Sequence, residues 1–280
     1  MSTDPRERPI AVFDSGVGGL TVLHELLVQL PHEDFIYLGD TARFPYGERS
    51  PAELEAFALE IAEELLGRQA KLLVVACNSA TAAALPALQA RMRQTTLGVD
   101  VIGVVRPEAV QAVTATRNGR IGLLATTATV ASGAYEQAVR AADPHVDLYP
   151  VACPELAPLI QAGFPADPRI VEVVRAAVTP LREAGVDTVI LGCTHYPLVR
   201  PVLQRLLGRG VEIITSGEAL ARQVEHVLGA RDLASRRTTE GDYRFLSTGD
   251  PEVFRDLGSR FLQLPLGPVE RVHLRHEASR

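Results

Sequence analysis

The chain has 280 residues, which corresponds to about two domains at the usual ~150 residues each. Hydrophobic residues make up 46% of it and charged residues 22%, a globular composition that excludes a disordered, collagen-like or coiled-coil chain. The net charge is −6, from 28 Lys and Arg against 34 Asp and Glu, and this argues against a nucleic-acid partner, because such surfaces need a basic excess.

The chain begins with a polar segment, where a signal peptide needs an apolar one, and no apolar run reaches the ~20 residues of a membrane-spanning helix. A cytoplasmic protein with no membrane partner is therefore expected.

Beyond the N-terminal segment, short apolar β-branched runs alternate with amphipathic stretches, a pattern typical of a βαβ series and a parallel sheet. Strands are predicted at residues 10–13, 35–38, 71–76, 101–105, 120–125, 146–150, 188–191 and 211–215.

Two of the predicted helices carry clear end signals. The helix at 51–68 follows Ser50 as N-cap, and Glu53 completes a capping box. The helix at 170–184 stops at Gly185, a residue typical of helix C-termini. Together with the strands, these helices predict an α/β fold with mainly parallel sheets.

The two halves of the chain contain similar sequence strings. An apolar strand followed by a cysteine occurs in VVACNSATA and again in VILGCTHYP, and the opening IAVFDSGVGG resembles IGLLATTATV. These echoes predict two similar lobes, lobe A of residues 1–103 and 214–280 and lobe B of residues 104–213. Because parallel sheets bind ligands beyond the carboxyl ends of their strands, all four turns should meet in one cleft between the lobes. The stretch after residue 211 is expected to return to the first lobe, and residues 271–280 to be frayed.

The positions of the cysteines and of the single lysine exclude several kinds of site. Cys77, Cys153 and Cys193 lie far apart without a C-x-x-C pair, which argues against disulfides and against a metal site. The single lysine, Lys71, stands at the edge of an apolar strand, where a solvated flank is expected. A pyridoxal enzyme needs a Schiff-base lysine, so an enzyme acting at an amino-acid carbon would work here without that cofactor.

Cys77 and Cys193 each directly follow a predicted strand. A thiol in this place lies near the N-terminus of the next helix, whose partial positive charge should lower the pKa of the thiol. A buried, inert cysteine is the alternative for either residue alone, but the matching contexts favour a functional pair. Cys153 has no such context and is expected to be structural.

Polar residues stand at the same strand ends. Asp14 opens the DSGVGG turn, whose glycines let a ligand approach the backbone N–H groups, although Asp14 would equally suit a helix N-cap. The spacing is not G-x-G-x-x-G, so a dinucleotide site is not indicated. His195, two residues after Cys193, is placed to hydrogen-bond a reacting group or to tune the thiol. The turn-rich stretch 40–47 suits a lid or wall of a site, or an ordinary surface loop.

Four strings in this order, FDSGVGGLTV, YLGDTARFPYG, ACNSATA and LGCTHYPL, resemble the glutamate racemase family of cofactor-independent amino-acid racemases. The resemblance runs from about residue 10 to about residue 220. It implies interconversion of L- and D-glutamate without a cofactor, with Cys77 and Cys193 as the paired acid and base, Asp14 assisting Cys77 and His195 assisting Cys193. It also implies a supply of D-glutamate for bacterial peptidoglycan, and a homodimer.

By the same resemblance, the amino-acid substrate is held by Asp14, Ser15, Tyr46, Gly47, Asn78, Ser79, Thr194 and His195. Without pyridoxal to delocalise the carbanion, fixed hydrogen-bond donors must stabilise it, and Asn78 is expected to be one of them.

The sequence departs from the family pattern at two positions. Gln161 stands in a PLIQ string where members commonly carry glutamate; an amide cannot take a proton, so no acid–base role is carried over, although it can still form hydrogen bonds. Arg106 stands where an acidic or apolar residue is expected, and we expect it between the lobes or on the surface.

Two alternatives stay open. An aspartate or hydantoin racemase of the same superfamily would share the thiol pair but differ in its pocket, although the THYP string after Cys193 and the PYG string at Tyr46 favour glutamate. A non-catalytic, two-lobed amino-acid-binding protein would carry inert thiols. Rapid alkylation of Cys77 and Cys193 that substrate blocks would separate the enzyme from the binding protein.

Overall fold

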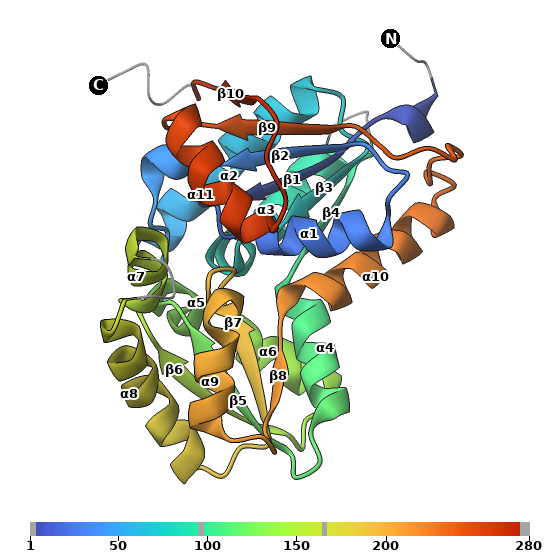
Figure 1. The fold of residues 1–280 in the computed structure, drawn as a ribbon. Helices are drawn as coiled ribbons and strands as arrows, with labels where there is room; N and C mark the ends of the chain where they lie inside the picture. The colour runs from blue at the N-terminus through green and yellow to red at the C-terminus, as the bar shows by residue number, and fades with distance from the viewer. Residues whose placement is uncertain (1–3, 95–97, 164–166, 275–280) are drawn as a thin grey trace.

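The computed structural model describes residues 4–94, 98–163 and 167–274, and two parallel sheets organise them (Figure 1). The larger sheet has the strand order β10 (Val269–Arg271), β9 (Tyr243–Ser247), β2 (Phe35–Gly39), β1 (Ile10–Asp14), β3 (Leu72–Val75) and β4 (Asp100–Gly103). The smaller sheet has the order β6 (Asp147–Ala152), β5 (Arg120–Ala125), β7 (Thr188–Gly192) and β8 (Glu212–Ile214). All the paired strands run parallel, which confirms the predicted α/β fold.

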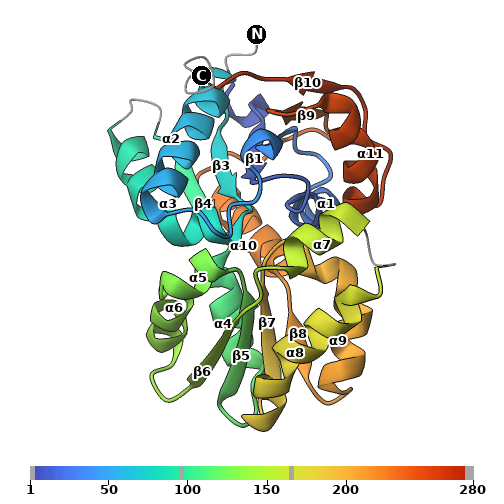
Figure 2. The same cartoon turned by 90° about the vertical axis from the view of Figure 1, so that its left-hand side faces the viewer.

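Helices cover both faces of each sheet (Figures 1 and 2). On the larger sheet, α1 (Leu20–Gln29) and α11 (Pro251–Leu262) pack on one face, and α2 (Pro51–Gly67) and α3 (Asn78–Arg93) pack on the other. The smaller sheet lies between α7 (Leu156–Gly163), α8 (Arg169–Glu183) and α9 (Arg200–Leu207) on one side and α4 (Val105–Ala115) and α6 (Ala134–Ala142) on the other. Within residues 4–94, 98–163 and 167–274, the remaining helices are α5 (Thr127–Ala131), α10 (Ser216–Ala230) and three short 3₁₀ turns, η1 (Pro5–Glu7), η2 (Thr41–Arg43) and η4 (Tyr196–Val199). None of the helices in the described ranges is long and apolar enough to cross a membrane.

Strand β1 shows why the apolar runs in the sequence are continuous. Ile10 and Val12 pack with the helices on one face, whereas Ala11 and Phe13 pack with those on the other. A strand covered on both faces buries every residue, so it needs apolar side chains throughout. This property made the central strands easy to recognise from the sequence.

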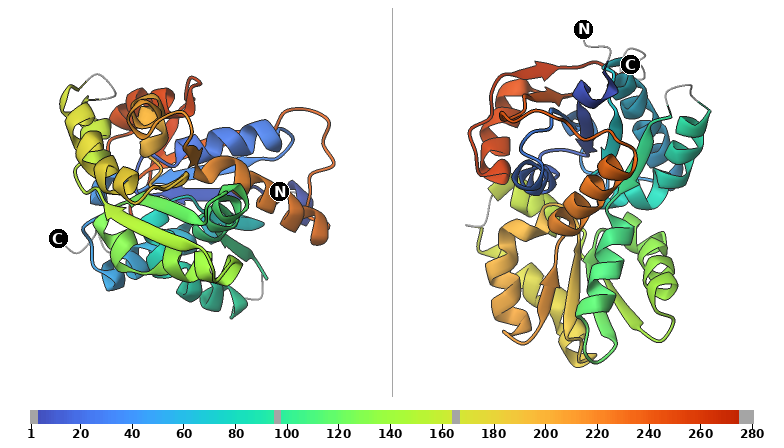
Figure 3. Two further views of the ribbon diagram at one scale, coloured as in Figure 1. Left: turned by 90° about the horizontal axis from the view of Figure 1, so that it is seen from below. Right: turned by 90° about the vertical axis from the view of Figure 1, so that its right-hand side faces the viewer.

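The chain passes between the sheets twice. It leaves the larger sheet after β4 through α4, and it returns after β8 through α10 to β9 and β10 (Figure 3). The chain does return to the larger sheet, but later than predicted, because the strand after residue 211, β8, still pairs with β7 of the smaller sheet. Arg271 belongs to β10 and is not frayed. Residues 275–280 lie outside the described residues. Arg106 is exposed on α4 and lines a surface groove between α4 and α10.

The predicted helix ends are confirmed. The Ser50 side chain accepts from the backbone N–H of Glu53 at 3.3 Å, and the Glu53 carboxylate accepts from the backbone N–H of Ser50 at 3.0 Å. Gly185 follows the end of α8 with φ of 67°, a left-handed conformation that glycine adopts without a steric penalty.

Lys71 is buried, so the prediction of a solvated flank is wrong. Its ammonium group donates to the Glu33 carboxylate, to the carbonyl oxygen of Arg6 at 2.6 Å and to that of Leu233 at 2.9 Å. Burial lowers the pKa of Lys71, and the Glu33 carboxylate opposes that shift. The strand start is therefore covered by segments from both ends of the chain.

Lys71→Met is expected to lower the free energy of unfolding by about 3–5 kcal/mol, because it leaves the Glu33 carboxylate buried without its counter-charge. Urea denaturation measures the loss. The double variant Lys71→Met, Glu33→Gln should recover part of it, since no charge then remains buried there. A single variant as stable as the wild type would contradict the assignment of this ion pair.

Candidate active site

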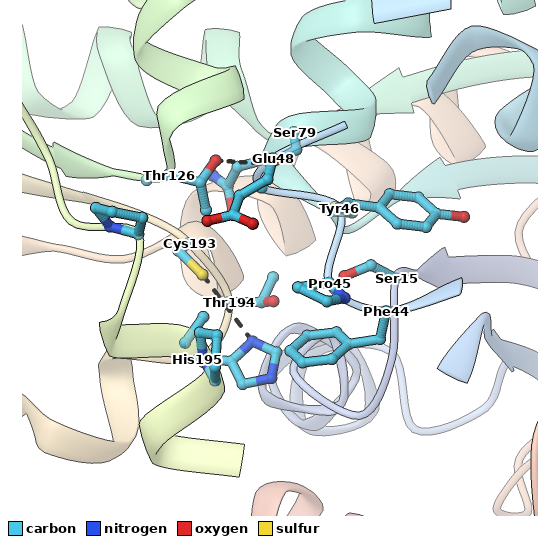
Figure 4. A pocket seen from close by; sticks show the side chains of 17 residues that line it. Ser15, Phe44, Pro45, Tyr46, Glu48, Ser79, Thr126, Cys193, Thr194 and His195 are labelled. Atoms are coloured by element: carbon cyan, nitrogen blue, oxygen red, sulfur yellow. Dashed lines mark hydrogen bonds between the residues drawn. The ribbon is translucent and has the colours of Figure 1, made fainter. Parts of the chain in front are cut away.

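The carboxyl ends of strands from both sheets border one cavity of about 70 Å³ (Figure 4). Its lining comes from the turns after β1, β2, β3, β5, β6 and β7. The lining residues are Ser15, Phe44, Pro45, Tyr46, Gly47, Glu48, Cys77, Asn78, Ser79, Thr126, Pro154, Ala157, Pro158, Gly192, Cys193, Thr194 and His195. The four turns that were expected to converge thus meet in one place.

The two thiols reach this cavity from different sheets: Cys77 follows β3 and Cys193 follows β7. They lie close enough for a charge on Cys77 to raise the pKa of Cys193. Both are buried, and burial raises the pKa of Cys77 to about 12 and that of Cys193 well above its ordinary value. The predicted lowering of the two cysteine pKa values by the helix N-terminus is therefore wrong. The backbone N–H of Ala80 does donate to Cys77 at 3.5 Å, but the desolvation of the thiolate is the larger effect.

His195 stands beside Cys193, with Nδ1 at 3.9 Å from the sulfur (Figure 4). Its Nε2 lies 2.9 Å from Oε1 of Gln161. An amide oxygen only accepts, so Nε2 carries the proton and Nδ1 is left as an acceptor that faces the thiol. Burial lowers the pKa of His195 to about 3, which keeps the ring neutral. Gln161 thus sets the tautomer of this histidine.

Asp14 lies beneath the cavity wall and is not among the described residues that line it. Its carboxylate accepts from Thr194 Oγ1 at 3.2 Å and from the backbone N–H of Gly16 at 3.0 Å. Burial raises the pKa of Asp14, and the charge of Asp14 raises the pKa of Cys77. Asp14 therefore acts on the cavity through Thr194 and Cys77.

The DSGVGG glycines make room for protein neighbours, where a bound ligand was expected. A Cβ on Gly18 would lie 2.4 Å from Nδ1 of His195, and a Cβ on Gly19 would lie 2.5 Å from the Cβ of Asp14. Real Cβ atoms do not approach this closely. Side chains at 18 and 19 would therefore displace His195 and Asp14.

The turn-rich stretch after β2 forms a wall of the cavity, one of the two alternatives for it. The Tyr46 hydroxyl donates to the Asp40 carboxylate, which also accepts from Arg43 Nε at 2.6 Å and from Thr248 Oγ1 at 2.8 Å. The hydroxyl of Tyr46 is thus committed to the protein. The carbonyl oxygen of Gly47 accepts from the backbone N–H of Ala128 at 2.8 Å, so this wall is tied to α5 of the smaller sheet.

Hydroxyl groups, not cations, supply the polar lining. Ser79 Oγ lies 2.9 Å from Thr126 Oγ1 and 3.1 Å from Thr129 Oγ1. Among the described lining residues there is no Lys or Arg, and Glu48, which is exposed at the mouth, carries the only carboxylate. Sequence reasoning missed Thr126, although the echo of the DSGVGG turn in ATTATV marked the turn that carries it.

Asn78 was expected to donate hydrogen bonds to the ligand, and its side chain is placed differently. Its Nδ2 donates to Tyr135 Oη at 2.7 Å and to Glu108 Oε2 at 3.2 Å. Both side-chain N–H groups are thus occupied, so only the backbone N–H of Asn78 is left to act as the expected donor. Glu108, which the sequence did not single out, is fully buried, and burial raises its pKa to about 8.

The titration of Glu108 makes stability depend on pH. An unfolded glutamate ionises near pH 4.5 and the folded one near 8, so the folded state binds more protons in between and stability falls as the pH rises through this window. Glu108→Gln is expected to flatten the fall between pH 5 and 8. Urea denaturation at several pH values measures both slopes, and equal slopes would show that Glu108 does not titrate there.

Two parallel α/β sheets thus bring two buried thiols to one small cavity. The family model described as Asp/Glu/Hydantoin racemase matches residues 20–224. The chain belongs to this family.

Individual relatives agree with this assignment. A glutamate racemase from Beutenbergia cavernae is 46% identical over 277 residues, covering 95% of this chain and 92% of that protein. The crystal structure of a glutamate racemase isoform from Bacillus anthracis is 38% identical with a TM-score of 0.90, covering 96% of this chain and 98% of that one. The crystal structure of glutamate racemase from Francisella tularensis in complex with D-glutamate is 31% identical with a TM-score of 0.88, covering 97% and 99%.

Proposed function

We propose that this chain interconverts L-glutamate and D-glutamate, with Cys77 and Cys193 as the two acid–base groups and with no cofactor. The observation that carries the proposal is the meeting of both thiols in one small cavity although they come from different sheets. The relatives named glutamate racemase, and the D-glutamate bound to the Francisella enzyme, support the choice of substrate.

Racemisation removes the Cα proton from one face of the substrate and returns a proton to the other, so it needs a base and an acid on opposite sides. One cysteine, as thiolate, takes the Cα proton while the other, as thiol, delivers its own to the opposite face. After a turnover the two have exchanged roles, which explains why the same residue type serves on both sides. The mirror-image products make the equilibrium constant in water one.

The electrostatics of the cavity identify the groups that assist the two thiols. Burial keeps both thiols protonated there, and the α-ammonium of a bound amino acid would favour a nearby thiolate. On the Cys193 side, Nδ1 of His195 is an acceptor for the thiol proton. On the Cys77 side, Asp14 is the assisting group, positioned by Thr194 and the backbone of Gly16.

The substrate carboxylates would be held by neutral groups. The hydroxyls of Ser15 and Ser79 line the cavity, as does that of Thr194, which donates to Asp14. The backbone N–H groups of Asn78 and Ser79, at the start of α3, precede the first intrahelical hydrogen bonds. Tyr46 and Gly47 contribute a ring and a backbone segment, because the Tyr46 hydroxyl is already used by Asp40. Donors of this kind also stabilise the negative charge that develops when Cα loses its proton.

The purified protein should be incubated with L-glutamate in heavy water without added cofactor, while optical rotation and Cα deuterium are followed. Loss of rotation with deuterium in the D-product is expected. Racemisation of L-aspartate in preference to L-glutamate would replace the proposed substrate. Glutamate binding without inversion or exchange, with thiols inert to alkylation, would favour the binding protein and overturn the enzyme.

We further propose that the product supplies D-glutamate for bacterial peptidoglycan in the cytoplasm, as the family resemblance implies. Lobe A, residues 1–103 and 214–280, would deliver Cys77, and lobe B, residues 104–213, would deliver Cys193. The homodimer stays a prediction, which light scattering on the purified chain would test.

A further inference from the structure

A buried carboxylate lies directly behind the cavity. Glu108, on α4, accepts from Ser216 Oγ at one carboxylate oxygen and from Tyr135 Oη and Asn78 Nδ2 at the other. Glu108 and Tyr135 are fully buried, and Asn78 and Ser216 are nearly so. Of these four residues, Asn78 alone lines the cavity.

The hydrogen bonds fix the orientation of the Asn78 amide. One N–H donates to Tyr135 and the other to Glu108. A flipped amide would place its oxygen against Oε2 of Glu108, which already accepts from Tyr135 Oη, so that two acceptors would meet. Glu108 therefore opposes the flip through Oε2, which stays an acceptor when the carboxyl proton lies on Oε1, the oxygen that faces Ser216.

In this orientation of the Asn78 amide, the hydrogen bonds of its oxygen, Oδ1, remain to be accounted for. Oδ1 of Asn78 is buried and has no hydrogen-bond partner among the residues that the structure describes. A buried acceptor without a donor is costly, by ~1–3 kcal/mol, and native structures hold few of them without a functional reason. Since Asn78 lines the cavity beside Cys77, the missing donor is expected from a molecule that enters the cavity.

We propose that Glu108 is a positioning residue that locks the Asn78 amide, together with Tyr135, so that Oδ1 accepts a hydrogen bond from the α-ammonium of the bound amino acid. This inference rests on the proposed function and adds the group that recognises the ammonium. An acceptor suits that group, because an ammonium only donates. The hydroxyls and thiols of the lining carry protons of their own, whereas Oδ1 carries none.

The anchoring of Glu108 suits this role. It lies in the first turns of α4, just after the chain leaves β4, and Ser216 is the first residue of α10, just after the chain leaves β8. Tyr135 lies on α6 and Asn78 begins α3. The carboxylate thus joins the two passages between the sheets to the helix that carries Asn78, and this arrangement leaves it little freedom to move.

A double-mutant cycle tests the proposal, with kcat and KM measured for Glu108→Leu, Asn78→Ala and the double variant. Glu108→Leu is expected to lower kcat/KM about tenfold, the effect of one hydrogen bond, mainly through KM. In the Asn78→Ala background the same change should cost less than twofold, because the amide through which Glu108 acts is gone. Equal losses in both backgrounds would overturn the proposal.

Two further variants keep the test decisive if Glu108→Leu folds poorly. Glu108→Gln can still accept from Asn78 and Tyr135 while its amide donates to Ser216, so it should stay within about threefold of the wild-type kcat/KM. Tyr135→Phe removes one partner of the amide and should raise KM. A Gln variant as impaired as the Leu variant, or a Phe variant with wild-type KM, would contradict the lock.

Lys71→Met serves as the matched control for lost stability, because Lys71 lies outside the cavity and its ion pair does not touch these residues. Its kcat and KM should equal those of the wild type at temperatures where it is folded. An inactive wild-type protein would contradict the proposed function itself. Equal losses of kcat/KM in both backgrounds of the cycle would contradict this inference alone.

Discussion

Replacing either Cys77 or Cys193 by serine is expected to lower kcat for racemisation about 10³-fold in both directions. A positioned acid–base group contributes ~10²- to 10⁴-fold, and a serine hydroxyl is far too weak an acid to supply the alkoxide that would replace a thiolate. The two side chains are nearly the same size, so the fold should be unaffected. Each variant loses one of the two faces from which a proton can be taken.

The measurement is polarimetry from each enantiomer, combined with Cα deuterium uptake in heavy water. A variant with one remaining thiol should exchange the Cα proton of one enantiomer only, without inversion. Cys153→Ser is the matched control: Cys153 is also buried, with a pKa raised by burial to about 11, but it does not line the cavity. Full-speed inversion by either active-site variant, or a loss as large in the control, would end the two-thiol mechanism.

Asn78→Ala is expected to lower kcat/KM about 10²-fold. A hydrogen bond to a charged group is worth ~1.5–3 kcal/mol, and the variant removes the only described acceptor that we assign to the ammonium. It also takes a donor away from Glu108.

Steady-state kinetics with both enantiomers measures the loss of Asn78. Lys71→Met is the control, because Lys71 lies outside the cavity and does not touch Asn78 or its partners; it should lower stability and leave KM nearly unchanged. A loss below threefold for Asn78→Ala would remove this residue from the site.

The parts of the fold that sequence predicted are those fixed by local pattern. β1, β3 and β7 are buried on both faces, so they read as apolar runs. Ser50 and Glu53 interact within one helical turn, and their spacing alone marks the helix start. β9 and β10 were not predicted as separate strands: β10 has three residues, two of them exposed, and β9 begins with partly exposed residues, so neither shows a clear period.

The candidate site likewise has parts that could be predicted from the sequence and parts that could not. The turns after β1, β3 and β7 could be placed because parallel strands end at one edge of a sheet. The partners of Asn78 could not, since Glu108 and Tyr135 lie 30 and 57 residues away in sequence. The pKa of Cys77 was predicted in the wrong direction for a related reason: a helix N-terminus is visible in sequence, whereas the desolvation that outweighs it arises only when both sheets close over the sulfur.

The hydroxyl-rich lining of the cavity has a consequence for how solution conditions affect the protein. Dissolved ions screen attraction between full charges, but they weaken hydrogen bonds from enclosed hydroxyls and backbone amides far less. With no Lys or Arg among the described residues of the lining, affinity for a dicarboxylic amino acid should change little between dilute buffer and concentrated sodium chloride. The protein would then recognise an anionic metabolite while remaining insensitive to the ionic strength around it.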